Sequence, residues 1–352
     1  MHSFVDLDRL LATVPSAVVI RLRRVDRGQG SEDLFRHQVP DLLTELANRA
    51  RVSSITASSA LEGIVVPDRA RAAAIIDGRA AVLRSRSEQE LAGYRTALDY
   101  LFSSDWRPLN TGLLLHLHRT LFAGTSAPGG GFKESDNLVV DRSPDGLVTV
   151  RFTPVPAART TYFTTELLDR YAEAARAGRH HPVLLVGLFV LDLLTIHPFT
   201  DGNGRVARVL TNALLADCEY GVGRYVSLEQ LIAESADGYY RALLESTHGW
   251  HQRANDPWPW LQYFVDVLAR AYTRFAEGVA EGRPSGTKSE RVREHVLQHS
   301  TTVFAISDVR AALPGVSDPT IRLVLNQLKA EGRIRSEGTG RSAVWVRRPD
   351  SE

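Results

Sequence analysis

One apolar segment constrains the fold of this chain more than any other feature. Pro182 to Ile196 is apolar almost throughout and contains a single charged residue, Asp192. The segment is too short to cross a membrane, so we expect a buried helix. From Val206 to Cys218 apolar residues again recur at helical spacing. The sequence therefore predicts two buried helices joined by one short polar run, in a mostly helical protein.

The run that joins these helices has the composition of a phosphate site. His197 to Arg208 reads H-P-F-T-D-G-N-G-R-V-A-R. Gly202 and Gly204 let the backbone turn tightly, so that amide N–H groups at the start of the second helix can point at an anion. Arg205 and Arg208 are three residues apart, so both side chains project to one side of that helix, where guanidinium groups can hold phosphates.

The same run contains a base and a carboxylate. His197 has an ordinary pKa of about 6.5, so its imidazole is mostly neutral at pH 7 and can accept a proton from a hydroxyl group. Asp201 would repel phosphates unless a cation lay between them. Mg²⁺, which favours carboxylate and phosphate oxygens, is the natural mediator.

The complete run resembles the signature of the Fic family, H-P-F-x-[D/E]-G-N-G-R-x-x-R, and every specified position is filled. The resemblance implies transfer of AMP from ATP to a protein hydroxyl, with His197 as general base, Asp201 as the Mg²⁺ ligand and Phe199 as a core anchor. For the phosphates it implies an anion hole at Gly202, Asn203 and Gly204, a β-phosphate contact at Arg205 and a γ-phosphate contact at Arg208.

A second motif far upstream resembles the inhibitory helix of the same family, [S/T]-x-x-x-E-[G/N]. Ser58 to Gly63 reads S-S-A-L-E-G. The resemblance implies that Glu62 pairs with Arg208 and prevents seating of the γ-phosphate. A carboxylate competing with phosphate for one cation gives reversible inhibition.

Between the two motifs the sequence predicts a β-hairpin. Residues 128 to 133 resemble the P-G-x-F/Y-R element that precedes the family's flap, with Lys133 in place of arginine. The segments 137–140 and 147–152 favour strands, and Ser143-Pro144-Asp145-Gly146 between them favours a turn. The hairpin either packs on the helices as decoration or, as the resemblance implies, binds the target protein as an added strand.

Two residues are candidates for the adenine pocket. Tyr239 and Tyr240 are adjacent on a predicted helix and cannot share one face, so we expect at most one ring, that of Tyr240, to reach the base. Leu194 lies one turn before His197 and is a second candidate for this pocket.

The C-terminal part resembles a winged helix-turn-helix domain. Residues 281–287 are rich in Gly, Pro and Ser and predict a linker. Three helices and a small hairpin are expected in residues 288–352. The third helix would present Thr320, Arg322, Asn326 and Lys329 to a groove, and the basic residues of the wing are Arg333, Arg335, Arg341, Arg347 and Arg348. DNA binding and protein docking are both open for this domain.

We therefore expect a mostly α protein with four parts. Residues 1–89 form an N-terminal helical segment that contains the inhibitory helix around 54–63, and residues 90–280 form a Fic-type helical core with its flap at 133–152. The linker at 281–287 and the winged helix at 288–352 follow.

Composition excludes several other classes. Cys218 is the only cysteine, which rules out an internal disulfide framework and a cysteine-rich zinc site. His116 and His118 are two apart, so they diverge around a helix and do not form a metal-binding pair. A net charge of +1 argues against a polyanion-binding surface over the whole protein. The N-terminus has no run typical of a signal peptide, so we expect a cytoplasmic protein without a membrane partner.

The leading hypothesis is an autoinhibited protein adenylyltransferase that uses ATP and Mg²⁺. Its partner is a protein with a hydroxyl side chain, and modification of one copy by another in a homo-oligomer would be one way to relieve Glu62. Two alternatives remain open: removal of AMP from a modified protein by water that Glu62 activates, and a DNA-binding regulator whose Fic core senses nucleotide.

Overall fold

The structure is a computed structural model that describes residues 2–103, 105–127, 129–142, 148–282, 288–300, 302–313, 316–337 and 344–347. The chain divides into two compact units. Met1–Asp33 and Leu43–Glu277 form the first unit, and Leu34–Leu42 and Gly278–Glu352 form the second. Each unit is described by itself.

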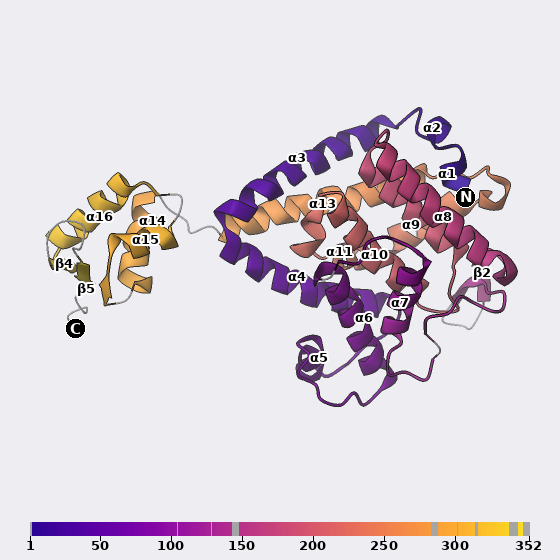
Figure 1. Cartoon of the computed structure of the whole chain (residues 1–352), viewed down its shortest axis with the longest axis horizontal. Helices are drawn as coiled ribbons and strands as arrows, with labels where there is room; N and C mark the ends of the chain where they lie inside the picture. The colour runs from indigo at the N-terminus through magenta and orange to yellow at the C-terminus, as the bar shows by residue number, and fades with distance from the viewer. Residues whose placement is uncertain are drawn as a thin grey trace. The chain divides into compact units, whose positions relative to one another are not determined.

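Helices dominate the first unit, as the sequence predicts (Figure 1). Its longer helices are α3 (Ser16–Gln38), α4 (Pro40–Leu61), α6 (Arg86–Ser103), α7 (Thr111–Leu121), α8 (Ala157–Ala177), α9 (Pro182–Ile196), α10 (Asn203–Asp217), α12 (Ala236–Thr247) and α13 (Trp258–Gly282), of which α3, α4 and α13 also contribute residues to the second unit. Its shorter helices are α1 (His2–Val5), α2 (Leu7–Leu10), α5 (Arg69–Ile76), η1 (Gly221–Arg224), α11 (Leu228–Ala233) and η2 (Trp250–Gln252).

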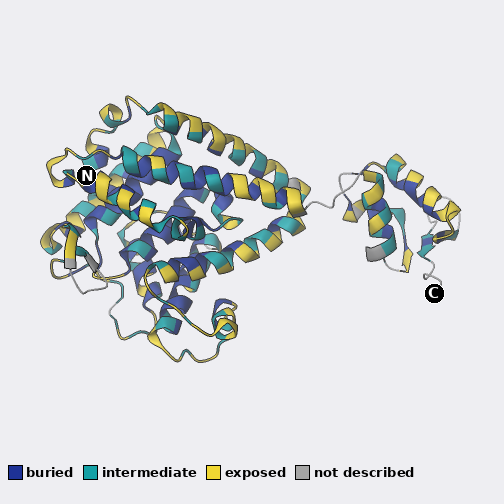
Figure 2. Cartoon of the chain, turned by 180° about the vertical axis from the view of Figure 1, so that it is seen from behind, coloured by how far each residue is buried: buried dark blue, intermediate teal, exposed yellow. Residues whose placement is uncertain are grey.

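Helix α9 is the centre of the first unit, and every residue of it except Pro182 and Leu194 is buried. Buried residues, in dark blue, gather in the interior of this unit (Figure 2). Pro182 suits the first helical position because its missing N–H would have no partner there. The helix packs against α8 and α10, and α13 meets it at Gly187, whose carbonyl accepts a 2.7 Å hydrogen bond from the indole of Trp260. A helix buried on all sides is a rigid support for the residue at its end.

The aspartate inside α9 is held by two neutral donors. The Ser3 hydroxyl and the Trp250 indole N–H both donate to Oδ1 of Asp192, at 2.9 and 2.8 Å. Burial raises the pKa of Asp192 to about 6, and these hydrogen bonds limit the rise. Asp192 therefore holds α1 and η2 against α9 through these two hydrogen bonds.

The predicted hairpin is present as β1 (Val139–Arg142) and β2 (Val148–Phe152), which pair antiparallel with Val140 opposite Val150. The predicted turn at 143–146 and Pro128, the first residue of the flap element, lie outside the described residues. The second strand of the hairpin, β2, ends at Phe152, shortly before α8 begins at Ala157.

The second unit contains helices α14 (Lys288–Glu294), α15 (Ile306–Ala312) and α16 (Asp318–Ala330) and strands β3 (Val303–Phe304), β4 (Ile334–Glu337) and β5 (Val344–Arg347). The strands form an antiparallel sheet in the order β3-β5-β4. The three helices and the hairpin expected in residues 288–352 are present among the described residues, and Pro319 lies in the first turn of α16. Helix α14 ends at Glu294, where a π-helical turn (His295–His299) follows, and β3 is a strand beyond the expected hairpin.

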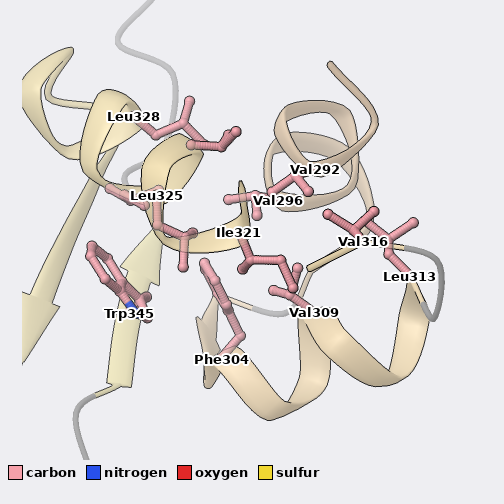
Figure 3. Close-up of a cluster of buried hydrophobic side chains, with 12 residues drawn as sticks. Val292, Val296, Phe304, Val309, Leu313, Val316, Ile321, Leu325, Leu328 and Trp345 are labelled. Atoms are coloured by element: carbon pink, nitrogen blue, oxygen red, sulfur yellow. The ribbon is translucent and has the colours of Figure 1, made fainter. Parts of the chain in front are cut away.

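One cluster of buried side chains holds the second unit together (Figure 3). Its members come from all three helices and all three strands: Val292, Val296, Phe304, Val309, Leu313, Val316, Ile321, Val324, Leu325, Leu328, Ile334 and Trp345. A separate core of this kind agrees with an independent C-terminal module. The assignment of this module as a winged helix stays a prediction.

Among the described residues, no helix is both long enough and apolar enough to span a membrane.

Candidate active site

His197 lies where α9 ends, and the backbone turns out of the helix there. Its φ of 53° is in the left-handed region, which is uncommon for a residue with a side chain. The imidazole Nδ1 is 3.1 Å from the carbonyl oxygen of Leu194. Because a carbonyl can only accept, Nδ1 carries the hydrogen, and Nε2 of the neutral ring keeps its lone pair for an incoming proton.

Lys133 braces the segment around His197. Its backbone N–H donates to the Pro198 carbonyl at 2.9 Å, and its Nζ donates to the Ile196 carbonyl at 3.3 Å and to Oδ1 of Asn137 at 2.8 Å. Burial lowers the pKa of Lys133 to about 8. Burial also lowers the pKa of His197 to about 4, with a further contribution from the charge of Lys133. His197 is therefore a neutral base at pH 7.

The loop after His197 is fastened by its own side chains. Phe199 is fully buried and stacks on the ring of His118, with centroids 4.0 Å apart and an interplanar angle of 11°. Oδ1 of Asn203 accepts a hydrogen bond from the Phe199 N–H at 2.9 Å, and its Nδ2 donates to the Phe199 carbonyl at 2.7 Å. Phe199 thus lies where an anchor was predicted, while the Asn203 amide holds the loop closed.

His118 is the second support of this loop. The Gly130 N–H donates to Nδ1 at 2.9 Å, so Nε2 carries the hydrogen and donates to the Asp201 carbonyl at 3.1 Å. Burial lowers the pKa of His118 to about 4, which keeps the ring neutral. The sequence analysis considers His118 only as a metal ligand and misses this role, because both partners are distant in sequence.

The two glycines at the start of α10, Gly202 and Gly204, lie close to the side chains of Phe122 and Glu62 respectively. Gly202 has a φ of 80°, and a Cβ there would lie 2.9 Å from the Phe122 ring. A Cβ on Gly204 would lie 2.4 Å from Oε1 of Glu62. The left-handed backbone of Gly202 favours glycine, whereas a side chain at Gly204 would displace the carboxylate of Glu62. The N–H groups of the first turn of α10 can point at an anion.

Arg208 is occupied by the upstream motif. Its Nε donates to the Ser58 hydroxyl at 2.9 Å, and its Nη2 donates to the Ser58 carbonyl at 3.2 Å and to Oε1 of Glu62 at 2.7 Å. The side chain of Arg208 is 5% exposed and that of Glu62 is 29% exposed. Burial works to raise the pKa of Glu62, but the charge of Arg208 outweighs it and holds this pKa below its usual value. The predicted pair of side chains is in contact.

Arg205 and Arg208 have different partners, whereas the sequence predicts that both side chains serve one anion on one side of α10. Its guanidinium is 1% exposed, donates from Nη1 to Oε2 of Glu90 at 2.5 Å and lies over the Phe122 ring, 4.9 Å from the centroid. Glu90 comes from α6 and is itself 5% exposed. The sequence analysis does not predict this buried ion pair, because 115 residues separate its partners.

Arg86 contacts the carboxylates of Glu90 and Asp201, which Arg205 also approaches. Its Nε donates to Oε1 of Glu90 at 2.5 Å, and its Nη2 is 3.5 Å from Oδ2 of Asp201. Arg205 approaches the other oxygen of Asp201 at 3.5 Å. Two arginines and two carboxylates therefore form one cluster beside the start of α10, and Arg86 and Asp201 are its exposed members.

A cavity of about 220 Å³ has His197, Gly204, Arg208 and Glu62 in its lining. Its lining residues are Glu62, Val139, Arg151, Phe152, Leu194, His197, Gly204, Arg208, Tyr239, Tyr240, Leu243, Leu244 and Thr247. Leu194 and Tyr240 are in this lining, and Tyr239 joins them, whereas the sequence analysis expects at most one tyrosine ring to reach the pocket. The Arg151 guanidinium, from β2, lies over the Tyr240 ring at 5.0 Å.

Several basic residues of the second unit have partners among its described residues. Arg310 pairs with Asp318, Arg293 with Glu331 and Arg335 with Glu337. Arg322 and Asn326 are exposed on α16, Thr320 is half-buried beside the Ser317 hydroxyl, and Lys329 donates to the Ser336 hydroxyl. Arg347 donates to the Leu297 carbonyl, and Arg341 and Arg348 lie outside the described residues. DNA binding and protein docking both stay predictions.

Comparison with known protein families matches residues 108–215 to the Fic/DOC family. A curated protein from Drosophila virilis, named protein adenylyltransferase Fic, is 26% identical over 189 residues, which are 52% of this chain and 36% of that protein. The protein of the same name from Drosophila melanogaster is 28% identical over 134 residues, 37% of this chain and 25% of that protein. The matches thus span about a third or less of these relatives.

Solved structures support the fold over a longer range. A Fic family protein from Desulfovibrio desulfuricans G20 is similar with a TM-score of 0.63 and 21% identity, over 97% of this chain and 98% of that chain. A Fic domain containing signaling protein from Bacteroides thetaiotaomicron VPI-5482 has a TM-score of 0.60 and 23% identity, over 76% and 99% of the two chains. The mostly helical fold class predicted from the sequence is confirmed.

Proposed function

The chain carries a domain of the Fic/DOC family, as its signature predicts, and from this premise we propose that it is a protein adenylyltransferase. It transfers AMP from ATP to a hydroxyl group of a protein side chain and releases pyrophosphate. One observation carries the proposal: His197, Gly204 in the first turn of α10 and Arg208 line one cavity of about 220 Å³. The proposed base, His197, and the proposed phosphate-binding residues, Gly204 and Arg208, thus share one cavity.

The nucleotide would extend from the apolar wall of the cavity to the start of α10. Leu194 and Tyr240 are on the wall and would contact adenine. The N–H groups around Gly202 and Gly204 would bind phosphate oxygens, and Arg208 would bind the terminal phosphate once it leaves Glu62.

In the reaction, the target hydroxyl oxygen attacks the α-phosphorus in line with the leaving group. Its proton passes to Nε2 of His197, and the bond between the α-phosphorus and the bridging oxygen of pyrophosphate breaks. Because the protein forms no covalent bond, its contribution is position and charge stabilisation. The Leu194 carbonyl orients the ring for this proton transfer by holding Nδ1–H.

The residues at Asp201 fit Mg²⁺ bound together with a nucleotide. The carboxylate is 52% exposed and offers oxygen, the element that this ion prefers. Among the described residues, no group of three His, Cys, Asp or Glu side chains could hold a metal alone. The remaining ligands would be water and phosphate oxygens, and the ion would neutralise charge on the departing pyrophosphate.

The target segment would lie along the flap. Val139, Arg151 and Phe152 of the hairpin line the cavity, while Leu138 and Val150 are exposed. Addition of a strand to this hairpin would place a hydroxyl near His197 through main-chain hydrogen bonds.

Autoinhibition by Glu62 is part of the proposal. Its carboxylate lies against Gly204 and binds Arg208 at 2.7 Å, so that it takes the place of a terminal phosphate. A second candidate function uses the same group. Because Arg208 keeps Glu62 ionised at pH 7, this carboxylate could instead activate water to remove AMP from a modified protein.

Replacing Asp201 with asparagine should abolish the response of AMP transfer to Mg²⁺. Asparagine keeps an oxygen that can accept the Gly202 N–H, which donates to Asp201 at 2.6 Å, but it lacks the charge that holds the metal. We would measure transfer across a Mg²⁺ titration in the Glu62→Gly variant with and without Asp201→Asn. Full-rate transfer by the asparagine variant, or in excess chelator, would contradict the assignment.

Transfer should persist in mildly acidic solution. A base is active when unprotonated, so activity is lost as the pH falls through its pKa, which burial lowers to about 4 in His197. We expect kcat/KM of the Glu62→Gly variant to stay level from pH 7 down to about pH 5, since this ratio reports ionisation of the free enzyme. Tryptophan fluorescence over the same range would check that the fold persists. A decline centred at about pH 6.5, the ordinary imidazole value, would show that burial does not set this pKa.

A further inference from the structure

We infer that Tyr94 is a positioning residue for Arg208, the arginine that would bind the terminal phosphate. This inference rests on the proposed function. It concerns a buried network of three residues, Ser58, Tyr94 and Glu229, which holds the guanidinium from the protein side. None of the three is among the described lining residues of the 220 Å³ cavity, so they would act through Arg208 and not on the nucleotide.

The groups at the two ends of the network fix the direction of its hydrogen bonds. A guanidinium can only donate, and the Nε–H of Arg208 donates to the Ser58 hydroxyl oxygen at 2.9 Å. At the other end, Oε1 of Glu229 accepts from the Tyr94 hydroxyl at 2.9 Å. The hydrogen of Tyr94 is thereby used, and its oxygen is left to accept the hydrogen of the Ser58 hydroxyl.

Burial and the pKa of Tyr94 agree that the two hydroxyls are neighbours. Ser58, Tyr94 and Glu229 are fully buried, so water does not compete for their hydrogen bonds. Burial and the charge of Glu229 raise the pKa of Tyr94 well above its usual value. The charge of Arg208 and a side-chain hydrogen bond with Ser58 oppose this rise. Both hydroxyl hydrogens thus point toward Glu229, and a lone pair of Ser58 points toward Arg208.

Glu229 is a fixed end for the network. Its Oε1 also accepts from Nδ2 of Asn212 at 2.7 Å, and its Oε2 accepts from the Ser227 hydroxyl at 3.3 Å. Asn212 is on α10, one turn after Arg208, and Glu229 is in the first turn of α11. The network therefore joins α4, α6, α10 and α11 around the guanidinium.

The network becomes important when phosphate replaces Glu62. Arg208 then loses its direct carboxylate partner but keeps the Ser58 hydroxyl on Nε and the Ser58 carbonyl on Nη2. A guanidinium that is already oriented loses less conformational freedom on binding, which increases affinity for the phosphate. Without the Tyr94 hydroxyl, that of Ser58 has lost its acceptor and can turn its lone pair away from Nε. Tyr94 would thus favour nucleotides that carry a terminal phosphate.

The test compares two nucleotides that differ by one phosphate. Calorimetric titration of the full chain carrying Glu62→Gly would measure Kd for α,β-methylene ATP and for α,β-methylene ADP, both with Mg²⁺. Neither can be split at the bond that the reaction breaks, and only the first has the phosphate that Arg208 would bind.

Four further variants of this parent would be titrated. Tyr94→Phe removes one hydroxyl and keeps the ring, Ser58→Ala removes the next hydroxyl, and the third variant combines both changes. Tyr100→Phe is the matched control, since Tyr100 is on the same helix and its ring lies against His116. Circular dichroism would check that each variant is folded.

We expect Tyr94→Phe to raise Kd for α,β-methylene ATP about fivefold, as for the loss of one hydrogen bond between uncharged groups. Kd for α,β-methylene ADP should change less than about twofold. The combined variant should lose no more than Ser58→Ala alone, because that change already breaks the network. Tyr100→Phe should match its parent.

Two kinds of result would overturn the inference. An unchanged Kd for α,β-methylene ATP, an equal rise for both nucleotides, or additive losses in the combined variant would show that Tyr94 does not act through Ser58 and Arg208, while the proposed function would stand. A parent that binds neither nucleotide, or binds both equally, would contradict the proposed role of Arg208 and the inference with it.

Discussion

In a chain that already carries Glu62→Gly, replacement of His197 with alanine is expected to reduce AMP transfer to background. The reduction should be on the order of 10²- to 10⁴-fold, the usual contribution of a positioned general base. The imidazole is the neutral acceptor on the wall of the cavity, since the Leu194 carbonyl holds its Nδ1–H and Nε2 therefore carries the lone pair. Without it, the attacking hydroxyl keeps its proton.

Initial rates of pyrophosphate release with ATP, Mg²⁺ and a protein target would measure this loss. The fold should survive, because the loop is held by Phe199, Asn203 and His118 and not by the imidazole of His197. His116→Ala is a suitable control, since His116 is on α7 and contacts Tyr100 instead of the loop. A double variant that keeps the rate of its parent would mean that another group accepts the proton.

Replacement of Glu62 with glycine alone is expected to raise AMP transfer by about ten- to a hundredfold. Hydrogen bonds to charged groups contribute about 1.5–3 kcal/mol, and about 1.4 kcal/mol corresponds to a factor of ten. The contact of Glu62 with Arg208 is opposed by the position of Glu62. Helix α4 ends at Leu61, so the carboxylate of Glu62 lies at the negative end of the helix dipole, and Arg208 compensates this repulsion. Glycine at this position is outside the helix, so the cost in stability comes from the lost ion pair with Arg208 and not from a break in α4.

Rates and ATP affinity should change together in this variant, because Arg208 becomes available to the terminal phosphate. Glu45→Gly is the matched control: it removes an exposed carboxylate from the same helix, where Glu45 pairs with Arg49. It should leave transfer unchanged, although glycine inside a helix costs about 1 kcal/mol. If Glu62→Gly instead lowers transfer, the inhibitory assignment is wrong. If it abolishes AMP removal from a modified protein, the water-activating function of Glu62 is the better account.

The sequence predicts those parts of the site that are formed by neighbours along the chain. The apolar run and the glycines after it predict that α9 and α10 meet at His197, and local strand and turn preferences predict the flap. The contact of Glu62 with Arg208 was also predicted, but only through resemblance to a family, since nothing in the local pattern joins residues 146 positions apart.

Other parts of the site depend on tertiary packing and could not be predicted. Arg86 and Glu90 are four residues apart on α6 and look like an ordinary surface ion pair. Only the packing of α6 against α10 buries Glu90 and brings Arg205 to it. The spacing of His116 and His118 speaks only against a metal site. The role of His118 follows from the backbone groups of Asp201 and Gly130, which the fold brings to its two ring nitrogens.

Incorporation of radioactive label from ATP tests the central claim most directly. The wild-type chain, Glu62→Gly and Glu62→Gly with His197→Ala would each be incubated with Mg²⁺ and a cell lysate, once with α-labelled and once with γ-labelled ATP. The account predicts that protein retains the α-label, that Glu62→Gly strengthens this labelling, that the double variant loses the gain, and that Glu62→Gly gives no gain of γ-label over the double variant. A gain of γ-label that depends on His197, or no gain of α-label with Glu62→Gly, would contradict the transfer of AMP by this site.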